Sequence, residues 1–524
     1  MKQNRLAAMD IGTNSIRSIV IEVDGNGKYR ILDDEKVTVR LGEGLNRSGS
    51  IAPAAWERAL EALARQKKIV DGYQVRSIEA VATSAVRKAA NGAAFIAAIR
   101  ERVGLEVEVI SGEEEAELAA MSAFHHFDLE GVHHLVFDIG GGSLELVTAL
   151  GTHIEEVLSL ELGAVFLTEK FLKSDPVSPA EHAKLRRHVR KALRRSFGTQ
   201  ERKALQCLIG SGGTTTSVAA IAMAARGERH ESLHGYELLR SEVVHLLAGL
   251  LRMDDKERRT LPGLSPDRSD IIVAGVTVID ELMDFFKTNL LRVNERGIRE
   301  GLILRGLRRE RLLPSERPRR SWRESVLEFG RSCHFDQEHA QHVAGLSREI
   351  FLALAPRFGF TEKAGRLMEA AALLHDVGYF INYSGHHKHS YHLIRHADLL
   401  GFTPRERELI ANIARYHRKS LPKKKHEPYL RLSEKDRLLV SLLGGIVRLC
   451  DGLDRRRNKA VAAVTPALSK GVLRLCLSGQ DDLSVELFGA KEKSDLLQAA
   501  TGLHLAIERI PAPQAPPLAT ASGA

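Results

Sequence analysis

Two stretches of the sequence nearly repeat each other and carry residue types that can bind phosphate and a metal ion. The first, DIGTNSIRSIV, runs from Asp10 to Val20, and the second, DIGGGSLELV, runs from Asp138 to Val147. Each begins Asp-Ile-Gly, has a serine at its sixth position and follows an apolar run. A tight turn of this kind exposes consecutive backbone N–H groups, which bind anions. A carboxylate at the end of a strand can hold Mg²⁺ directly or through water.

The second turn contains three consecutive glycines, which let the backbone approach a phosphate without a Cβ clash. Ser15 and Ser143 add hydroxyl donors to the two turns. Two such turns facing each other would hold one phosphate from both sides. We therefore predict a two-sided phosphate clamp, with two ordinary interstrand turns as the alternative.

The segments around the two motifs predict alternating strands and helices. Strands are expected over 6–9, 18–23, 77–82, 106–110, 135–139, 144–150, 153–160 and 206–209. Helices are expected over 53–68 and 175–198 and from Glu113 onward, and residues 24–27 (DGNG) are typical of a hairpin turn. The first part of the chain is therefore predicted to be two α/β blocks, each opened by the repeated motif.

The rest of the chain has a different pattern. Residues 313–320 are typical of a linker, 322–457 show helical periodicity, and strands are expected over 472–477 and 483–488. The segment 510–524 is rich in proline and alanine, which favours disorder. The predicted domains are therefore residues 1–128, 129–310 and 311–509, followed by a disordered tail, 510–524.

The composition is that of a globular protein with anionic partners. Of 524 residues, 44% are hydrophobic and 27% charged, and the formal net charge is +9. No apolar run approaches the length of a membrane span, and the N-terminus does not resemble a signal peptide. The four cysteines are far apart, which favours a reducing cytoplasm.

The paired motifs resemble the two phosphate loops of the actin, heat-shock chaperone and sugar-kinase superfamily, and the details resemble one branch, the Ppx/GppA phosphatases. The segments that carry this resemblance are DIGTNSIR, ATSAVRKA, ISGEEEAELA, DIGGGSLEL, IGSGGT, LPGLSPDRSDIIVAG and GIREGLI, in family order over about the first 305 residues. The fold class it implies is α/β: two actin-like (ribonuclease H-like) domains followed by a mostly α-helical, HD-like domain.

The resemblance also implies an activity and a set of site residues. It implies Mg²⁺-dependent release of terminal phosphate from inorganic polyphosphate, conversion of guanosine pentaphosphate to tetraphosphate, or both. It places Arg87 on phosphate oxygens and Asp138 and Glu145 at the Mg²⁺ ion. The implied phosphate-binding residues are Asp10, Gly12, Thr13, Asn14, Ser15, Gly140, Gly141, Gly142, Ser143 and Gly212.

Hydrolysis also needs a base that takes a proton from the attacking water. Three glutamates, Glu113, Glu114 and Glu115, begin a helix directly after a predicted strand. The family has its catalytic glutamate at the last of these positions, so the resemblance implies Glu115. The alternative is that all three are solvated carboxylates that favour the start of a helix.

The expected partners are polyphosphate or guanosine pentaphosphate, with no membrane and no specific nucleic acid, and the expected assembly is a cytoplasmic homodimer. Two other functions are considered. One is an ATP-dependent kinase of the same superfamily, and the other is a non-catalytic regulator that binds guanosine tetra- or pentaphosphate. The Glu115 segment disfavours the kinase, and the retained Glu115, Arg87, Asp138 and Glu145 disfavour the regulator.

Basic residues form three clusters. Arg186, Arg187, Arg190, Lys191, Arg194 and Arg195 recur at helical spacing, and Lys423–Lys425 and Arg455–Arg457 are two short runs. Each cluster can be a solvated face or part of a surface that attracts a polyanion.

The helical block carries a metal-binding pattern. His339, the pair His375-Asp376 and Asp451 resemble the H…HD…D set of HD-type phosphohydrolases. His389 and His417 fall where some HD proteins add ligands for a second metal. Nitrogen and carboxylate ligands together suit Mn²⁺, Fe²⁺ or Mg²⁺. The alternatives are a divalent metal held by these residues and a degenerate domain that only packs.

Overall fold

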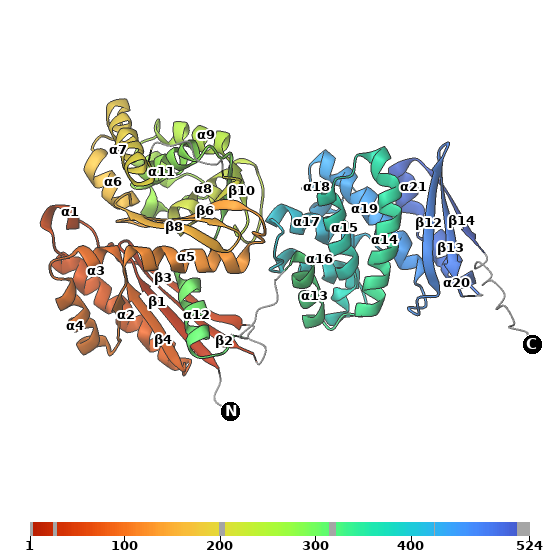
Figure 1. Cartoon of the computed structure of the whole chain (residues 1–524), viewed down its shortest axis with the longest axis horizontal. Coiled ribbons are helices and arrows are strands. Elements are labelled where there is room, and N and C mark those ends of the chain that lie inside the picture. The colour runs from red at the N-terminus through yellow and green to blue at the C-terminus, as the bar shows by residue number, and fades with distance from the viewer. Residues whose placement is uncertain are drawn as a thin grey trace, which may run out of the picture. The chain divides into compact units, whose positions relative to one another are not determined.

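The computed structural model describes residues 4–24, 29–198, 205–313, 321–423, 425–480 and 482–510. The chain divides into two compact units, Met1–Arg319 and Arg320–Ala524, called here the N-terminal unit and the C-terminal unit. The N-terminal unit contains both DIG motifs and two separate sheets, and the C-terminal unit is mostly helical (Figure 1). The domain boundaries at 128, 310 and 509 stay predictions.

The first sheet of the N-terminal unit has the strand order β3-β2-β1-β4-β5. Its strands are β1 (Arg5–Ile11), β2 (Ser15–Val23), β3 (Tyr29–Thr38), β4 (Ser77–Ala82) and β5 (Glu108–Val109). Its helices are α1 (Leu45–Ser48), α2 (Pro53–Gly72), α3 (Ser84–Lys88), α4 (Gly92–Val103) and α5 (Gly112–His126).

The second sheet has the order β10-β11-β9-β6-β7-β8. Its strands are β6 (His133–Ile139), β7 (Leu144–Leu150), β8 (His153–Leu160), β9 (Cys207–Ser211), β10 (Glu237–Leu239) and β11 (Leu290–Val293). The helices that follow β8 are α6 (Ala164–Phe171), α7 (Pro179–Phe197), α8 (Gly212–Ala225), α9 (Arg240–Leu250), α10 (Asp255–Arg259), the 3₁₀ turn η1 (Pro266–Arg268), α11 (Ile272–Phe285) and α12 (Ile298–Arg309).

The two sheets repeat one topology. In the first, β1, β2 and β3 pair antiparallel, and β4 joins β1 in parallel. In the second, β6, β7 and β8 pair antiparallel, and β9 joins β6 in parallel. Each DIG motif forms the turn of the first hairpin of its sheet. The sequence repeat is therefore a repeat of a folding unit.

Helix α5 lies between the two sheets (Figure 1). One of its sides packs on β6, β7 and β8 through alanines such as Ala116 and Ala120. The other side packs against α12, where a Cβ atom on Gly301 would lie 2.2 Å from the carbonyl oxygen of Leu118. Helix α12 comes late in the sequence but covers the first sheet with Leu302 and Leu307. Contacts from both sheets thus fix the helix that begins with the glutamate run.

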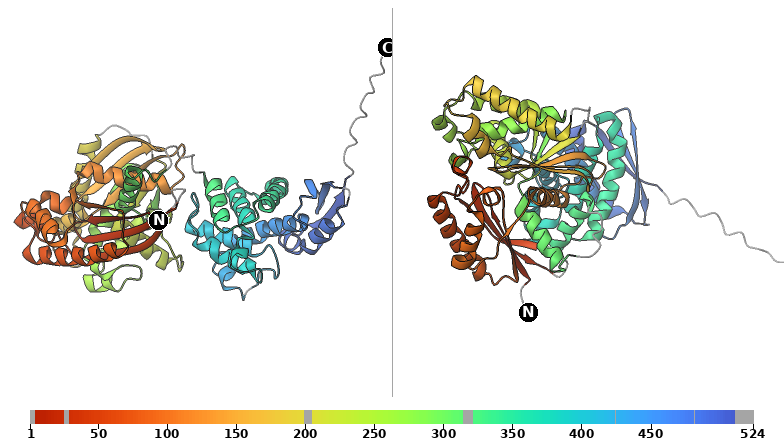
Figure 2. Two further views of the ribbon diagram at one scale, coloured as in Figure 1. Left: turned by 90° about the horizontal axis from the view of Figure 1, so that it is seen from below. Right: turned by 60° about the vertical axis from the view of Figure 1, so that its left-hand side comes forward.

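The C-terminal unit is a helical bundle with a small sheet. Its helices are α13 (Trp322–Ser332), α14 (Gln337–Phe358), α15 (Glu362–Leu374), the 3₁₀ turn η2 (Val377–Phe380), α16 (His386–His396), α17 (Pro404–Arg415), α18 (Glu427–Leu430), α19 (Glu434–Leu453), α20 (Ser484–Glu492) and α21 (Asp495–Thr501). Its sheet has the order β12 (Val461–Ser469), β13 (Val472–Gly479) and β14 (His504–Arg509), and β12 contacts α14 (Figure 2).

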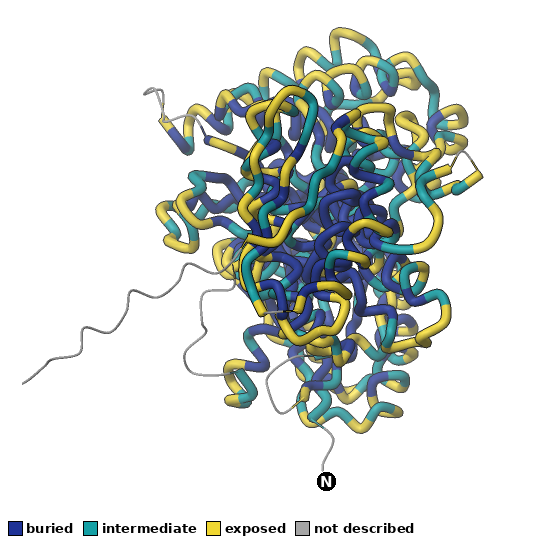
Figure 3. The backbone as a smooth tube through the Cα atoms, turned by 90° about the vertical axis from the view of Figure 1, so that its right-hand side faces the viewer, coloured by how far each residue is buried: buried dark blue, intermediate teal, exposed yellow. Residues whose placement is uncertain are grey.

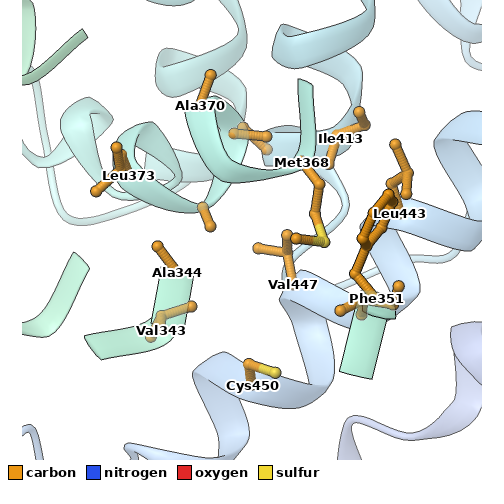
Figure 4. Close-up of a cluster of buried hydrophobic side chains, with 14 of the residues drawn as sticks. Val343, Ala344, Phe351, Met368, Ala370, Leu373, Ile413, Leu443, Val447 and Cys450 are labelled. Carbon is orange, nitrogen blue, oxygen red and sulfur yellow. The ribbon is translucent and has the colours of Figure 1, made fainter. Parts of the chain in front are cut away.

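Helices α14, α15, α17 and α19 meet in a continuous apolar core. Figure 4 shows Phe351, Met368, Ile413 and Val447, one from each of these helices, packed in this core. Buried residues are dark blue in Figure 3 and lie inside, with exposed residues outside them. Cys450 belongs to this core, so its neighbour Asp451 on α19 is held at the core's edge. Within the described residues, no helix is long and apolar enough to cross a membrane.

One predicted element is wrong. The sequence predicts a strand over 483–488, whose apolar residues alternate, but residues 484–492 form helix α20. The carboxylate of Asp482 accepts a hydrogen bond from the backbone N–H of Ser484 at the start of this helix (2.9 Å). Helix α20 then packs on α19, where a Cβ atom on Gly489 would lie 2.6 Å from the carbonyl oxygen of Gly452. Tertiary packing therefore overrides the local alternation.

Five strands lie outside the predicted strand ranges, namely β3, β10, β11, β12 and β14, whereas β4, β7 and β8 have the predicted limits. The predicted hairpin turn at 24–27, the linker at 313–320 and the tail at 510–524 lie almost wholly outside the described residues.

Two arginines of the predicted basic face form ion pairs with a neighbouring helix. Arg186 and Arg190 on α7 both form ion pairs with Glu281 on α11, whose side chain is 1% exposed. Arg186 Nε lies 2.6 Å from Glu281 Oε1. Each of these two arginines thus pairs with a buried carboxylate while its own side chain stays 34% (Arg186) or 44% (Arg190) exposed, and a surface that attracts a polyanion stays a prediction.

Candidate active site

The two DIG turns have the same backbone geometry and lie against each other. Gly12 N–H donates to the carbonyl of Ser15 (3.1 Å), and Gly140 N–H donates to the carbonyl of Ser143 (3.0 Å). A Cβ atom on Gly141 would lie 2.9 Å from Cβ and Cγ2 of Thr13. The absence of a side chain at Gly141 therefore lets the second turn approach the first.

A polar cavity of about 100 Å³ lies between the turns. Among the residues that line it are the predicted phosphate-binding residues Asp10, Gly12, Thr13, Asn14, Ser15, Gly140, Gly141, Ser143 and Gly212, together with Glu115 and Asp138. Hydroxyls of Thr83 and Ser84 and the start of α8 complete part of its wall. The structure thus brings most of the predicted site residues into one space.

The first turn of α5 gives its three glutamates different surroundings. Ser111 and Glu114 cap the helix reciprocally: the Ser111 hydroxyl accepts from the Glu114 backbone N–H (3.1 Å), and the Glu114 carboxylate accepts from the Ser111 N–H (2.7 Å). Glu113 is exposed. Only Glu115 is buried, at 4% exposure, and it lines the cavity. The capping box therefore accounts for Glu114 and leaves Glu115 as the inward carboxylate.

Arg87 on α3 is placed beside Glu115. Its Nη1 donates to the backbone carbonyl of Ile110 (2.6 Å) and to Glu115 Oε2 (3.4 Å). Arg87 does not itself line the cavity. Its immediate contact is the buried glutamate.

Two other predicted residues lie just behind the cavity wall. Gly142 is packed between the two halves, since a Cβ atom there would lie 2.6 Å from the Ser84 hydroxyl. Glu145 is 1% exposed, and its Oε1 accepts a hydrogen bond from the Ser159 hydroxyl (3.1 Å). These two residues support the cavity without lining it.

Four acidic side chains meet around this cavity with strongly altered ionisation. Burial raises the pKa of Asp10 to about 6 and that of Glu145 to about 8. Burial also raises the pKa values of Asp138 and Glu115, the latter reinforced by the negative charge of Glu145. Low-dielectric surroundings disfavour several carboxylates together unless a cation joins them.

The acidic set fits a divalent cation. Asp10 Oδ1 and Glu145 Oε2 are buried and have no hydrogen-bond partner. Asp138 Oδ2 accepts from the Ser211 hydroxyl (2.9 Å). At Gly212, where φ is +86°, a Cβ atom would lie 2.6 Å from Asp138 Oδ1. Hard oxygen ligands of this kind are those that Mg²⁺ uses.

Three arginines line the same cavity and were not predicted. They are Arg17, Arg268 in η1 and Arg299 in α12. Arg17 lies on β2 directly opposite Asp10 on β1 in the strand register. Burial, together with the nearby positive charge of Arg17, lowers the pKa of Arg268 to about 10. Each arginine lies within a motif that carries the family resemblance. Because arginine binds phosphate strongly, its presence in these motifs could have identified all three as site residues.

The C-terminal unit brings the other predicted set together. His339 Nε2 lies 3.4 Å from Asp451 Oδ1 and 4.0 Å from Asp376 Oδ2. His375 Nε2 lies 3.6 Å from Asp376 Oδ2 and 3.8 Å from Asp451 Oδ1. All four side chains are buried. They come from the start of α14, the end of α15 and the end of α19.

A second group adjoins the first through Asp376. His386 and His417 are fully buried and have Nε2 atoms 3.2 Å and 3.5 Å from Asp376 Oδ1. The prediction for His417 fits this arrangement. His389 belongs to neither group of potential metal ligands found among the described residues, and His386 takes the place expected for it.

Comparisons with known proteins agree with this architecture. The family model "Ppx/GppA phosphatase family" matches residues 19–310, and the model "Ppx/GppA phosphatase, domain III" matches residues 322–504. Exopolyphosphatase 2 of Mycobacterium tuberculosis is 32% identical over 317 residues, which cover 58% of this chain and 99% of that protein.

Solved structures show the same fold. The crystal structure of the Aquifex aeolicus Ppx/GppA family member is 29% identical and covers 59% of this chain and 98% of its own, with a TM-score of 0.52. An exopolyphosphatase from Cytophaga hutchinsonii is 27% identical and covers 59% of this chain and 100% of its own, with a TM-score of 0.55. The chain thus has two actin-like domains followed by a mostly helical domain, and it belongs to the Ppx/GppA phosphatase family.

Proposed function

We propose that the N-terminal unit hydrolyses the terminal phosphoanhydride bond of inorganic polyphosphate, with Glu115 as the general base. The observation that carries this proposal is the position of Glu115. It is the one buried carboxylate of its helix turn, and it shares a cavity with two phosphate-type turns and three arginines. The similarity to Exopolyphosphatase 2 of Mycobacterium tuberculosis supports the choice of substrate.

Different residues of the cavity would bind different phosphates of the chain. The N–H groups and hydroxyls of the two turns, including Ser15 and Ser143, would bind the oxygens of the terminal phosphate from two sides. Arg17, Arg268 and Arg299 would bind the following phosphates, since guanidinium groups pair strongly with phosphate oxygens. Their positive charge offsets the negative charge that a polyphosphate brings into a cavity already lined by carboxylates.

The reaction consumes one water. Glu115 accepts a proton from this water as its oxygen forms a bond to the terminal phosphorus. The bond between that phosphorus and the bridging oxygen breaks, and the shortened chain leaves with the bonding electrons. Because burial raises the pKa of Glu115 above its ordinary value, its carboxylate is a stronger base than an exposed glutamate.

We also propose that Asp138 and Glu145 hold Mg²⁺, with Asp10 close by. A bound Mg²⁺ supplies charge neutralisation at the phosphoryl group. Asp138 presents its Oδ1 beside Gly212, and Glu145 is oriented by the Ser159 hydroxyl. The buried and unpartnered oxygens of Asp10 and Glu145 support this assignment.

The test measures phosphate release from long polyphosphate, guanosine pentaphosphate and ATP, each with Mg²⁺ and after chelation. We expect Mg²⁺-dependent release of one phosphate at a time from polyphosphate, with the remaining chain shortened from its end. Transfer of phosphate from ATP to a small acceptor would contradict the proposal and favour a kinase. Tight binding of guanosine tetra- or pentaphosphate without any turnover would favour a regulator.

Guanosine pentaphosphate is proposed as a further substrate, since it also ends in a phosphoanhydride that the same clamp can hold. The homodimer is likewise a proposal, and light scattering on the purified full chain measures it.

A further inference from the structure

We propose that Lys36 is a further substrate-binding residue of the N-terminal unit, where it binds the part of a linear polyphosphate chain that extends out of the cavity over the edge of the first sheet. The proposal rests on the proposed function, because it takes the occupant of the cavity to be a phosphate chain. It adds a fourth cation to the three arginines of the cavity and gives the chain a direction. Lys36 itself is not among the residues that line the cavity.

Three side chains form a row across the first sheet, from the cavity to the edge of the sheet. Arg17 on β2 lies directly opposite Asp10 on β1, and Lys36 on β3 lies directly opposite Arg17. Residues opposed in this way project from the same side of a sheet, with Cβ atoms about 4.5–5.5 Å apart. Asp10 and Arg17 line the cavity, and β3 is the outer strand. Lys36 therefore lies one strand beyond the cavity, on the side that faces it.

The pair Arg17 and Lys36 places two cations opposite each other. Like charges in directly opposed positions destabilise a sheet. Within the described part of the chain, neither side chain forms an ion pair or a side-chain hydrogen bond. Desolvation and the positive charges of Arg268 and Arg17 lower the pKa of Lys36. An anion bound between these cations would remove their repulsion.

Two acidic residues beside Lys36 already have other partners. Asp34, two residues earlier on the same side of β3, accepts a hydrogen bond from the Arg299 guanidinium. Asp267 in η1 accepts a hydrogen bond from the Thr38 hydroxyl (2.8 Å). Both carboxylates are thus engaged on either side of Lys36, which leaves its ammonium group available to an added anion.

An edge strand can carry charged side chains for another reason, since charges discourage pairing with strands of other molecules. That explanation requires only a charge on β3. A glutamate at position 36 would supply one and could also pair with Arg17, whereas Lys36 adds repulsion. The lysine therefore indicates an anion that the two cations share.

The cavity favours a chain of phosphates over a nucleotide as this anion. No aromatic ring is present among the described residues that line it, so a base has no surface on which to stack. Two strand spacings, about 9–10 Å, separate the backbone at Asp10 from that at Lys36. A single phosphate held between the two turns does not span this distance, whereas a chain of phosphates does.

The first test is protection of Lys36 from acetylation in the full chain, with Glu115→Gln so that bound polyphosphate is not consumed. The protein is treated with a limiting amount of acetic anhydride alone, with inorganic phosphate or with long polyphosphate, and acetylation at each lysine is measured by mass spectrometry. We expect polyphosphate to slow acetylation of Lys36 about threefold or more, since the ammonium group pairs with phosphate oxygens. Inorganic phosphate, which does not reach beyond the clamp, should have little effect.

Lys68 is the internal reference for this test. It is exposed on α2, which packs with Met9 on the opposite side of the first sheet from Asp10. Equal acetylation of Lys36 with and without polyphosphate would overturn the proposal. Equal slowing at Lys36 and Lys68 would also overturn it, because polyphosphate would then coat the surface without a preferred path.

The second test is the kinetics of Lys36→Glu with long polyphosphate. A carboxylate at this position can pair with Arg17, so the melting temperature should not fall. We expect KM to rise about fivefold or more and kcat to stay within about twofold, because Lys36 binds the chain and not the reacting phosphate. Lys36→Arg should keep KM near the wild-type value, and Lys68→Glu, the same change of charge on α2, should leave it unchanged.

The outcomes separate this proposal from the proposed function. An unchanged KM in Lys36→Glu would overturn the role of Lys36 while polyphosphate hydrolysis stands. Failure of the wild type to hydrolyse polyphosphate would instead contradict the proposed function. The acetylation test would then still decide whether Lys36 binds the chain, because it requires no turnover.

Discussion

Arg87 and Glu115 form an ion pair at the edge of the cavity, with 3.4 Å between Nη1 and Oε2. The two residues lie 28 positions apart, on α3 and α5, and the pair was not predicted from the sequence. It couples the ionisation of the proposed base to a residue expected to contact phosphate.

This pair predicts a shift in the pH profile. Burial raises the pKa of Glu115, and the positive charge of Arg87 opposes that rise. In Arg87→Gln the pKa should rise further, so the reactive carboxylate is lost at a higher pH. The acid limb of the kcat/KM profile should therefore move to higher pH. Arg102→Gln, which breaks an exposed pair with Glu57, is the control. An unmoved acid limb in Arg87→Gln would mean that Glu115 is not the titrating base.

Glu115→Gln should keep the fold and lose turnover. A general base contributes about 10²–10⁴-fold to the rate, so kcat for polyphosphate should fall by that factor with little change in melting temperature. Glu113→Gln is the matched control, because Glu113 is exposed on the same helix turn. Retention of more than a tenth of the wild-type kcat in Glu115→Gln would rule out the assignment.

Gly141→Ala should separate the two turns. Its Cβ atom would lie 2.9 Å from two atoms of Thr13 and 3.3 Å from Val165, so the turns must move apart. We expect near-complete loss of activity and a loss of stability of about 1–3 kcal/mol, typical of overpacking. Denaturant unfolding and phosphate release measure the two effects. Gly249→Ala on α9 is the control, because a Cβ atom there meets nothing within 4 Å. Full activity in Gly141→Ala would mean that close contact of the turns is not needed.

The double variant Arg186→Gln/Arg190→Gln should destabilise the N-terminal unit. It leaves Glu281, whose side chain is 1% exposed, without either arginine. Because only the carboxylate is fully buried, the expected loss is about 1–3 kcal/mol, the cost of leaving a buried polar group without its partner, and thermal and denaturant unfolding measure it. A change below about 0.5 kcal/mol would show that Glu281 finds other partners. Arg187→Gln, on an exposed position of the same helix, should have no such effect.

The exposed arginines of α7 allow a test of whether this basic face attracts polyphosphate. Arg187→Glu/Arg194→Glu should raise KM for long polyphosphate more than for a short chain, because these arginines do not line the cavity and a short chain held there would not need them. The effect should shrink at high salt, since exposed charges are screened within about 8–10 Å at physiological ionic strength. Equal effects on both chain lengths would identify this face as a solvated surface.

Much of the secondary structure could be predicted from short sequence segments, because turns and many strands depend mainly on neighbouring residues. The strands predicted over 144–150 and 153–160 have the observed limits of β7 and β8, and the repeated DIG motif predicted two equivalent hairpins. The apolar alternation in 483–488 misled, because that segment packs as a helix on α19 through Gly489. Such packing depends on a partner about 40 residues away, which no local window contains.

The candidate site residues also fall into those that local sequence predicts and those that only the packed structure shows. Residue types and spacing alone determined that this chain carries two phosphate-type turns, a glutamate run at a helix start and an HD pair, because these are local features. Tertiary structure alone decided which glutamate is buried, that Arg17, Arg268 and Arg299 line one cavity, and that His386 rather than His389 joins Asp376. Burial, and the convergence of side chains from separate elements, arise only when the packed helices and sheets fix their directions. Sequence spacing therefore identified the chemistry, and packing selected the atoms that can perform it.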